Sequence, residues 1–188
     1  MREAVVVLDM TRDSIAPEAR AVELRKAVLP RAAAYLAWAR GKGMPVVFVC
    51  SARRRTDKWF LKFWELANEI WQPGQQPIAE LFQPKDTIVH KRRYSAFFAS
   101  DLELTLRELD VGSLQLIGWS TSLAVATTAI DAWQCGFPTT VVGDLTIAHA
   151  WGGHSVEENQ KWSLDYIAAM AKSKIVESGM LMRDELMK

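Results

Sequence analysis

The sequence predicts an α/β fold in which a mostly parallel sheet of six strands carries helices on both faces. Short, continuous apolar runs are typical of strands buried on both sides, and they alternate along the chain with segments of helical periodicity. Turn residues such as Pro73-Gly74 separate these segments. Strands that alternate with helices form parallel units with right-handed crossovers, and the length of 188 residues suits a single domain over 1–188.

The individual elements follow from these patterns. Strands are expected at the apolar runs, at 4–8, 46–50, 87–90, 114–117, 139–142 and 175–176. Helices are expected at the amphipathic segments, at 18–42, 57–70, 100–109, 121–134 and 154–171. Gly43 ends the first helix, and the spacing of Ser100 and Glu103 predicts a capping box at the start of the third. The result is a doubly wound, Rossmann-like arrangement.

Composition excludes several classes of function. The chain has 23 Lys and Arg against 22 Asp and Glu, so nucleic acid is not an expected partner. No apolar run approaches the roughly 20 residues of a membrane span, so no membrane association is expected. The first strand begins almost at once, which predicts no signal peptide and a cytoplasmic location. Cys50 and Cys135 are expected to be reduced and to pack as small hydrophobic residues.

Polar residues directly follow several of the predicted strands. Asp9, Ser51, Lys91 and the Trp119-Ser120 pair all occupy such positions. The carboxyl ends of parallel strands meet at one edge of a sheet, where α/β proteins bind their ligands. An aspartate and a lysine brought together in a cleft are candidates for acid–base chemistry.

Four segments in this order resemble the isochorismatase-like cysteine hydrolases. They are Val7-Leu8-Asp9-Met10, Lys91-Arg92-Arg93-Tyr94-Ser95-Ala96-Phe97, Gly118-Trp119-Ser120-Thr121-Ser122-Leu123-Ala124-Val125 and Val142-Gly143-Asp144. The resemblance implies a hydrolase of a small molecule that forms dimers or higher oligomers, with Asp9 as the acid or base and Lys91 as its electrostatic partner. It also implies a cis peptide bond at Trp119-Ser120, and an oxyanion held by the backbone N–H groups of Ser120 and Ala124.

Thiol members of this family carry their nucleophilic cysteine at the position of Ala124, and a methyl group cannot attack a carbonyl. Three explanations remain open. The protein resembles the true isochorismatases, which lack the cysteine and in which the aspartate protonates a vinyl ether. Alternatively, it is a cysteine amidohydrolase whose nucleophile has been replaced, naturally or by engineering. The third explanation is an inactive member that binds a ligand or a partner.

Further residues are candidates for substrate binding. Arg53 offers a carboxylate clamp, and Trp71, Arg93 and Tyr94 lie in segments that resemble isochorismatases, so a small anionic substrate is expected. Two departures are that the isochorismatases carry a glutamine near Ser51 and a tyrosine at the position of Ser120. The stretch after Ser51 lacks the ligands of the metal-binding nicotinamidases, so no metal is expected, and no dinucleotide motif indicates a cofactor.

Overall fold

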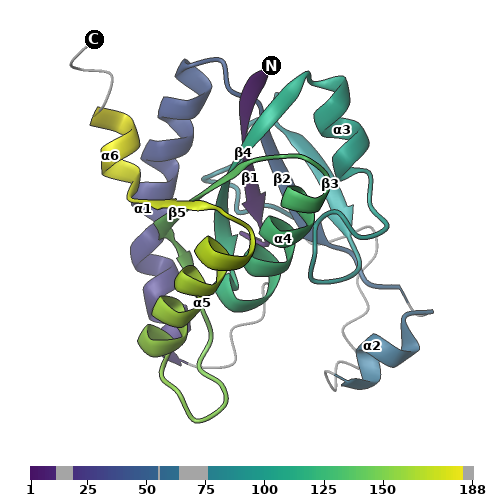
Figure 1. Ribbon diagram of the computed structural model, residues 1–188, viewed down its shortest axis with the longest axis vertical. Coiled ribbons are helices and arrows are strands. Elements are labelled where there is room, and N and C mark those ends of the chain that lie inside the picture. The colour runs from purple at the N-terminus through teal and green to yellow at the C-terminus, as the bar shows by residue number, and fades with distance from the viewer. Residues whose placement is uncertain (12–18, 55, 64–75, 184–188) are drawn as a thin grey trace.

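The computed structural model describes residues 1–11, 19–54, 56–63 and 76–183 of the chain. These residues form one six-stranded sheet with the strand order β3-β2-β1-β4-β5-β6 (Figure 1). Its strands are β1 (Arg2–Leu8), β2 (Val46–Ser51), β3 (Thr87–Lys91), β4 (Val111–Trp119), β5 (Thr139–Ile147) and β6 (Lys174–Val176). Every neighbouring pair is parallel, which confirms the predicted Rossmann-like α/β class.

Helices cover both faces of this sheet. They are α1 (Ala19–Gly41), α2 (Lys58–Phe63), α3 (Leu102–Glu108), α4 (Ala126–Gln134), α5 (Val156–Met170) and α6 (Ser178–Arg183). In Figure 1, α4 and α5 lie in front of the sheet, and α2 lies apart from the other helices. None of the helices in the described ranges is long and apolar enough to cross a membrane.

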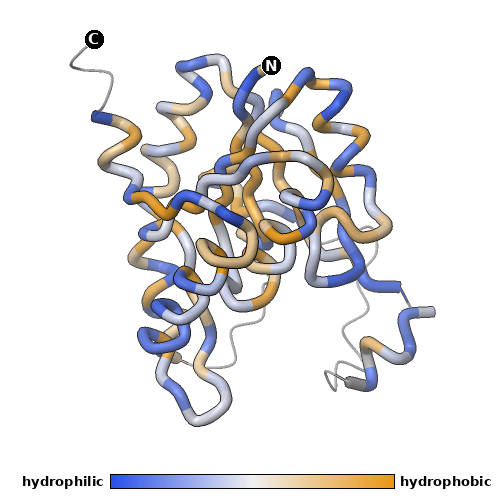
Figure 2. The backbone as a smooth tube through the Cα atoms, in the orientation of Figure 1, coloured by the Kyte–Doolittle hydropathy of each residue, from blue (hydrophilic) through white to orange (hydrophobic). Residues whose placement is uncertain are grey.

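Two hydrophobic cores lie on opposite faces of the sheet. In β1, Ala4, Val6 and Leu8 pack in the core beneath α3, α4 and α5, whereas Val5 and Val7 pack in the core beneath α1. Figure 2 shows the hydrophobic segments concentrated around the sheet and the hydrophilic ones at the outer turns. This alternation explains why β1 is apolar throughout, because both of its faces are covered.

Several local predictions differ from the structure. β4 and β5 are longer than expected, α6 was not expected, and residues 64–70 of the helix expected at 57–70 lie outside the described residues. The segment 121–134 forms a π-helical turn, η1 (Thr121–Val125), before α4 begins, whereas one continuous helix was expected. The capping box at Ser100 is wrong: Ser100 Oγ bonds the N–H of Leu102, and α3 begins there without a side-chain cap from its N-cap residue. A complete capping box instead starts α5, where Ser155 and Glu158 bond each other's backbone N–H groups.

The strand order changes direction between β1 and β4. From β1 the chain proceeds outward through β2 and β3 on one side, and it returns to build β4, β5 and β6 on the other. A doubly wound sheet opens a crevice at the carboxyl ends of the strands on either side of such a switch point. The first residue after β1 is Asp9, and β4 ends at Trp119, so the topology alone directs attention to this pair of strand ends.

Candidate active site

Asp9, Ser51 and Lys91 form a compact polar cluster at the carboxyl edge of the sheet. Lys91 Nζ lies 2.7 Å from Asp9 Oδ2, and Ser51 Oγ donates to Asp9 Oδ1 at 2.9 Å. Lys91 is 3% exposed on its side chain and Asp9 is 14% exposed, so the aspartate is the more open member of the ion pair. The structure therefore brings together Asp9 and Lys91, the two residues predicted to form an acid–base pair.

Three neighbouring strands place these side chains. Ser51 and Lys91 end β2 and β3 and are paired in register, and Asp9 follows β1, which pairs with β2. Asp9 has a positive φ of 51°, and its N–H donates to the carbonyl of Val49 at 3.0 Å. This left-handed conformation is tolerated by aspartate more readily than by most residues, and here it occurs at the candidate site.

The ammonium group of Lys91 is held by three acceptors. Besides Asp9, Nζ donates to the carbonyl of Arg93 at 3.1 Å and to Ser51 Oγ at 3.5 Å. An ammonium carries three N–H donors, so these contacts fix its position and leave its charge directed at the carboxylate. Lys91 is thus held in contact with the carboxylate of Asp9.

Replacing Ser51 by alanine removes one of the two hydrogen bonds that orient Asp9. We expect turnover to fall about tenfold, which is the value of one hydrogen bond to a charged group, while substrate affinity changes little. Steady-state kinetics of the purified variant would measure this, with Ser51→Thr as the control that keeps the hydroxyl. A turnover unchanged in Ser51→Ala would contradict an orienting role.

The turn from Gly118 to Ala124 follows β4, the strand that pairs with β1 on the side away from β2. Gly118 has φ 119°, and a Cβ there would lie 2.0 Å from the carbonyl oxygen of Leu8, so only glycine fits between β4 and β1. The Trp119-Ser120 peptide bond is cis, as the family resemblance implies. Ala124 is buried in η1, and π-helical turns of this kind occur frequently at functional sites.

Gln160 of α5 fastens this turn to the end of β5. Its Oε1 accepts from Thr121 Oγ1 at 2.7 Å and from the N–H of Ala148 at 2.8 Å. Its Nε2 donates to Thr146 Oγ1 at 2.9 Å and to the carbonyl of Gly143. The sequence analysis missed Gln160, because a single glutamine inside a helix gives no signal before the tertiary contacts are known.

Neither thiol of the chain is placed for nucleophilic attack. Cys50 lies in the core beneath α1, and burial raises the pKa of its thiol to about 12. Cys135 follows the C-terminal end of α4, whereas Ala124 precedes the N-terminal end of that helix. The pKa of the Cys135 thiol is raised, and burial is the largest cause. Both cysteines are free, but the raised pKa of each thiol disfavours the thiolate that nucleophilic attack requires.

Three of the predicted substrate-binding residues meet at Phe60 of α2. The guanidinium carbons of Arg53 and Arg93 lie 5.2 Å and 5.4 Å from the centre of the Phe60 ring, and Tyr94 packs edge-on against it at 5.6 Å. The aromatic ring thus gathers two cations from segments that follow β2 and β3. The fourth predicted residue, Trp71, lies outside the described residues.

A buried carboxylate that the sequence analysis missed holds this region together. Asp57 is 1% exposed, bonds the guanidinium of Arg92 and the N–H of Arg54, and lies 3.4 Å from Arg93 Nη1. These contacts lower the pKa of Asp57 to about 2, with the Arg92 hydrogen bond as the main cause. Because the Arg93 carbonyl accepts from Lys91, Asp57 is connected to the acid–base pair through the backbone of one loop.

Metal-ligating side chains do not cluster in the part of the chain that the structure describes: no group of three or more His, Cys, Asp or Glu residues meets there. Hydrogen bonds and ion pairs within the protein account for the polar atoms of Asp9, Ser51 and Lys91. The arrangement places a carboxylate against an ammonium group and a hydroxyl, and two arginines lie on the loops that follow β2 and β3.

Comparison with known proteins agrees with this geometry. The isochorismatase domain model matches residues 3–175. A relative named uncharacterized isochorismatase family protein YecD, from Escherichia coli O157:H7, is 29% identical over 81% of this chain and 83% of its own. The uncharacterized isochorismatase family protein PncA of Bacillus subtilis is 35% identical over 50% of this chain, and that match spans 49% of the relative.

The solved structure of N-carbamoylsarcosine amidase from Thermoplasma acidophilum has the same fold. It superposes with a TM-score of 0.76 at 26% identity and covers 95% of this chain and 97% of its own. The family model spans nearly all of the sheet, from β1 to the first residues of β6, and includes every residue of the polar cluster. The chain therefore belongs to the isochorismatase family of hydrolases.

Proposed function

We propose that the protein hydrolyses the vinyl ether of a small anionic substrate by acid–base catalysis without a thiol. The observation that carries this proposal is the complete Asp9–Lys91–Ser51 cluster in a chain whose residue 124, in the turn after the neighbouring strand β4, is alanine. A site that depended on a thiol would be disabled by this alanine. A vinyl ether needs only a proton donor and water, and the first of these is a carboxyl group that the cluster holds in place.

Protonation of carbon is the first step of the proposed reaction. In the proposed step, Asp9 Oδ2 takes the proton that it delivers from Lys91 Nζ, which lies 2.7 Å away. With the proton on Asp9, the acid delivers it to the terminal carbon of the enol ether, and the π electrons form the new C–H bond. The product is an oxocarbenium ion, and the carboxylate left on Asp9 stabilises this positive charge.

Water completes the reaction. It adds to the oxocarbenium carbon and returns a proton to Asp9, so the pair of Asp9 and Lys91 regains the proton that it delivered. The resulting hemiketal then breaks its bond to the ether oxygen, so an alcohol and a ketone leave. For an enolpyruvyl ether the ketone is pyruvate, and the atoms balance as substrate plus one water.

The two arginines beside Phe60 support an anionic substrate. The guanidinium groups of Arg53 and Arg93 both contact the Phe60 ring. A carboxylate bound next to this ring could form ion pairs with both of them. The Arg93 carbonyl also accepts from Lys91, so a substrate anion bound there would lie on the same loop that controls the proton of Asp9.

The direct test is pyruvate release from isochorismate by the unmodified protein, followed with a coupled dehydrogenase assay. Pyruvate formation that disappears in Asp9→Asn supports the proposal. Absence of pyruvate from isochorismate and from other enolpyruvyl ethers, with a protein shown to be folded, would refute it.

A second candidate is amide or ureido hydrolysis, with the nucleophile lost at Ala124. The likeness to N-carbamoylsarcosine amidase favours it, as do the paired hydroxyls of Ser120 and Ser122, whose Oγ atoms lie 3.0 Å apart. In that chemistry the Ser120 and Ala124 N–H groups would hold the oxyanion, and Asp9 would accept the proton of a cysteine.

Ala124→Cys separates the two candidates. For a natural vinyl-ether hydrolase we expect the variant to keep pyruvate release within about threefold and to gain no turnover of carbamoylated amines, because the surrounding residues are matched to another substrate. Ammonia release assays with such compounds would measure any gain. Amide turnover that appears in Ala124→Cys and vanishes in Ala124→Ser would identify the chain as an amidohydrolase without its nucleophile.

A further inference from the structure

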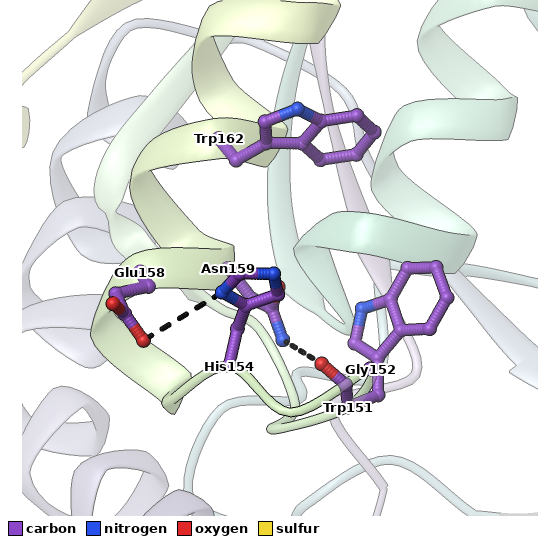
Figure 3. Close-up of a pocket in the computed structure, with 6 residues that line it drawn as sticks. All are labelled: Trp151, Gly152, His154, Glu158, Asn159 and Trp162. Carbon is purple, nitrogen blue, oxygen red and sulfur yellow. Dashed lines mark hydrogen bonds and ion pairs between the residues drawn. The ribbon is translucent and has the colours of Figure 1, made fainter.

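A second pocket lies between the loop that follows β5 and the first turns of α5. Its volume is about 340 Å³, and it shares no residue with the Asp9–Lys91–Ser51 cluster. Figure 3 shows its lining, which consists of Trp151, Gly152, His154, Glu158, Asn159 and Trp162. A volume of this order is at the lower end of the range for pockets that bind small molecules.

The loop that forms one wall is held in shape by its own contacts. Gly152 and Gly153 have φ values of 64° and 82°, a conformation that favours glycine, and they allow Trp151 and His154 to form a β-bridge. The buried side chain of Asn159 donates from Nδ2 to the carbonyls of His149 at 2.9 Å and Trp151 at 3.2 Å. The pocket is therefore preformed, and a ligand would not have to order it.

Two tryptophans present their rings to this pocket. Trp151 and Trp162 are 57% and 55% exposed, and in Figure 3 their indoles approach from different sides of the space above His154. Tyr166 stacks on Trp162 with ring centres 5.1 Å apart and planes 9° from parallel. Since the stack covers one face of the Trp162 indole, the opposite face is the one left for a ligand.

One carboxylate lines the pocket. Hydrogen bonds from Ser155 lower the pKa of the Glu158 carboxyl, so this group is ionised at neutral pH. Its Oε2 lies 3.9 Å from Nδ1 of His154, which carries a positive charge only when it is protonated. Among the described residues that line the cavity there is no lysine or arginine, and Lys161 on the next turn of α5 is paired with Asp165 at 2.9 Å. The negative faces of two indoles add to this field.

We infer that this pocket binds a compact organic cation, such as a quaternary ammonium or a protonated amine. Indole faces attract such cations within about 6 Å of the ring centre, and a nearby carboxylate adds an ordinary electrostatic attraction. A neutral molecule of the same shape would gain the apolar contact alone. The ligand class is thus distinguished by its charge, and the pocket acts independently of hydrolysis at Asp9.

The test is titration of the full chain with choline and with 3,3-dimethylbutan-1-ol, its uncharged isostere. Isotope-labelled tryptophan would report the indole N–H resonances of Trp151 and Trp162 in NMR spectra. We expect choline to shift both resonances with saturation and the neutral isostere to bind several-fold more weakly. Trp162→Leu should weaken choline binding about fivefold, the scale of one cation–π contact.

Glu158→Gln tests the charge without removing the helix cap, because glutamine also serves in a capping box. Choline affinity should fall about threefold, as for an exposed ion pair. Glu157→Gln is the matched control, since Glu157 occupies the same turn, does not line the pocket and pairs with Arg20 at 2.8 Å. Hydrolysis at the Asp9 site should be unchanged in all three variants.

Three results would overturn the inference. One is equal affinity for choline and its neutral isostere, which would show that the pocket binds by apolar contact alone and does not recognise a positive charge. Another is an absence of saturable shifts in folded protein. The last is a concentration-dependent self-association, seen by sedimentation, that Trp162→Leu abolishes and choline does not affect, because the two tryptophans would then belong to an interface between copies of the chain.

Discussion

Replacing Asp9 by asparagine is expected to lower pyruvate release at least about 100-fold, the lower range of what a positioned acid or base contributes. Asparagine keeps the size of the side chain and can still accept from Ser51, but it cannot deliver a proton to carbon. The ammonium of Lys91, which is 3% exposed, would also lose its anionic partner. Initial rates with saturating enolpyruvyl ether would measure the loss.

A control must separate this loss from damage to the fold. Asp86 is 2% exposed and pairs with Arg40 at 2.6 Å, so Asp86→Asn breaks a comparable buried ion pair outside the site. We expect Asp86→Asn to lower the melting temperature and to keep the turnover of its folded fraction. If Asp9→Asn and Asp86→Asn lost activity to the same extent, Asp9 would be structural and the proposed mechanism would fail.

Replacing Asp57 by alanine is expected to reduce both stability and turnover. The change leaves Arg92 and Arg93 without their shared buried carboxylate, and we expect a loss of about 2 kcal/mol because the two arginines are only partly buried. It also releases the backbone at Arg93, whose carbonyl holds Lys91 at 3.1 Å. Denaturant unfolding and steady-state kinetics would measure the two effects.

The kinetic signature distinguishes positioning from general destabilisation. An Asp57 variant that misplaces Lys91 should lower turnover at temperatures where it is fully folded, and Asp57→Glu should restore part of it. If fully folded Asp57→Ala turned over at the unmodified rate, the connection from Asp57 to Lys91 would have no role in catalysis.

Asp57 also predicts a dependence of stability on pH. Its pKa falls from an ordinary 3.8 to about 2 in the folded protein, so the unfolded chain takes up this proton first as pH decreases. The stabilisation is complete above about pH 4 and is lost as pH falls toward 2. Unfolding curves across this window should converge for the unmodified protein and Asp57→Ala. Curves that stayed equally far apart at low pH would show that the ionised carboxylate contributes nothing.

The positions of the strands and their parallel pairing could be predicted because both are indicated by short stretches of sequence. Apolar runs such as Ala4–Leu8 identify buried strands wherever they lie, and alternation with helices implies parallel pairing. Asp9, Lys91 and the Trp119-Ser120 turn were found in the same way, since a residue directly after a parallel strand must lie at the carboxyl edge. The resemblance to isochorismatase-like hydrolases then supplied their roles.

Other features depended on contacts between distant segments. The π-helical turn at Thr121–Val125 follows from how β4 meets α4, and the helical pattern of 121–134 does not reveal it. In the sequence, Asp57 is an ordinary acidic residue at the start of a helix. Its partners Arg92 and Arg93 are 35 and 36 residues away, and only the folded structure brings them into contact with it. The spacing of Ser100 and Glu103 fits the capping-box motif, but Ser100 does not form that motif in the structure. The capping box that the structure does contain is at Ser155, at the start of α5.

The sequence by itself therefore determined the fold class, and it predicted the sheet edge at which we propose the chemistry, because each rests on neighbouring residues. It also has alanine at position 124, where the family resemblance implies a nucleophile. Only the tertiary structure decided that Ser51 completes the Asp9–Lys91 pair, that Phe60 gathers Arg53 and Arg93, and that Trp151 and Trp162 enclose a second pocket. Those arrangements exist only where separate segments meet, since a side chain's hydrogen bonds and charge partners are fixed by distance in space.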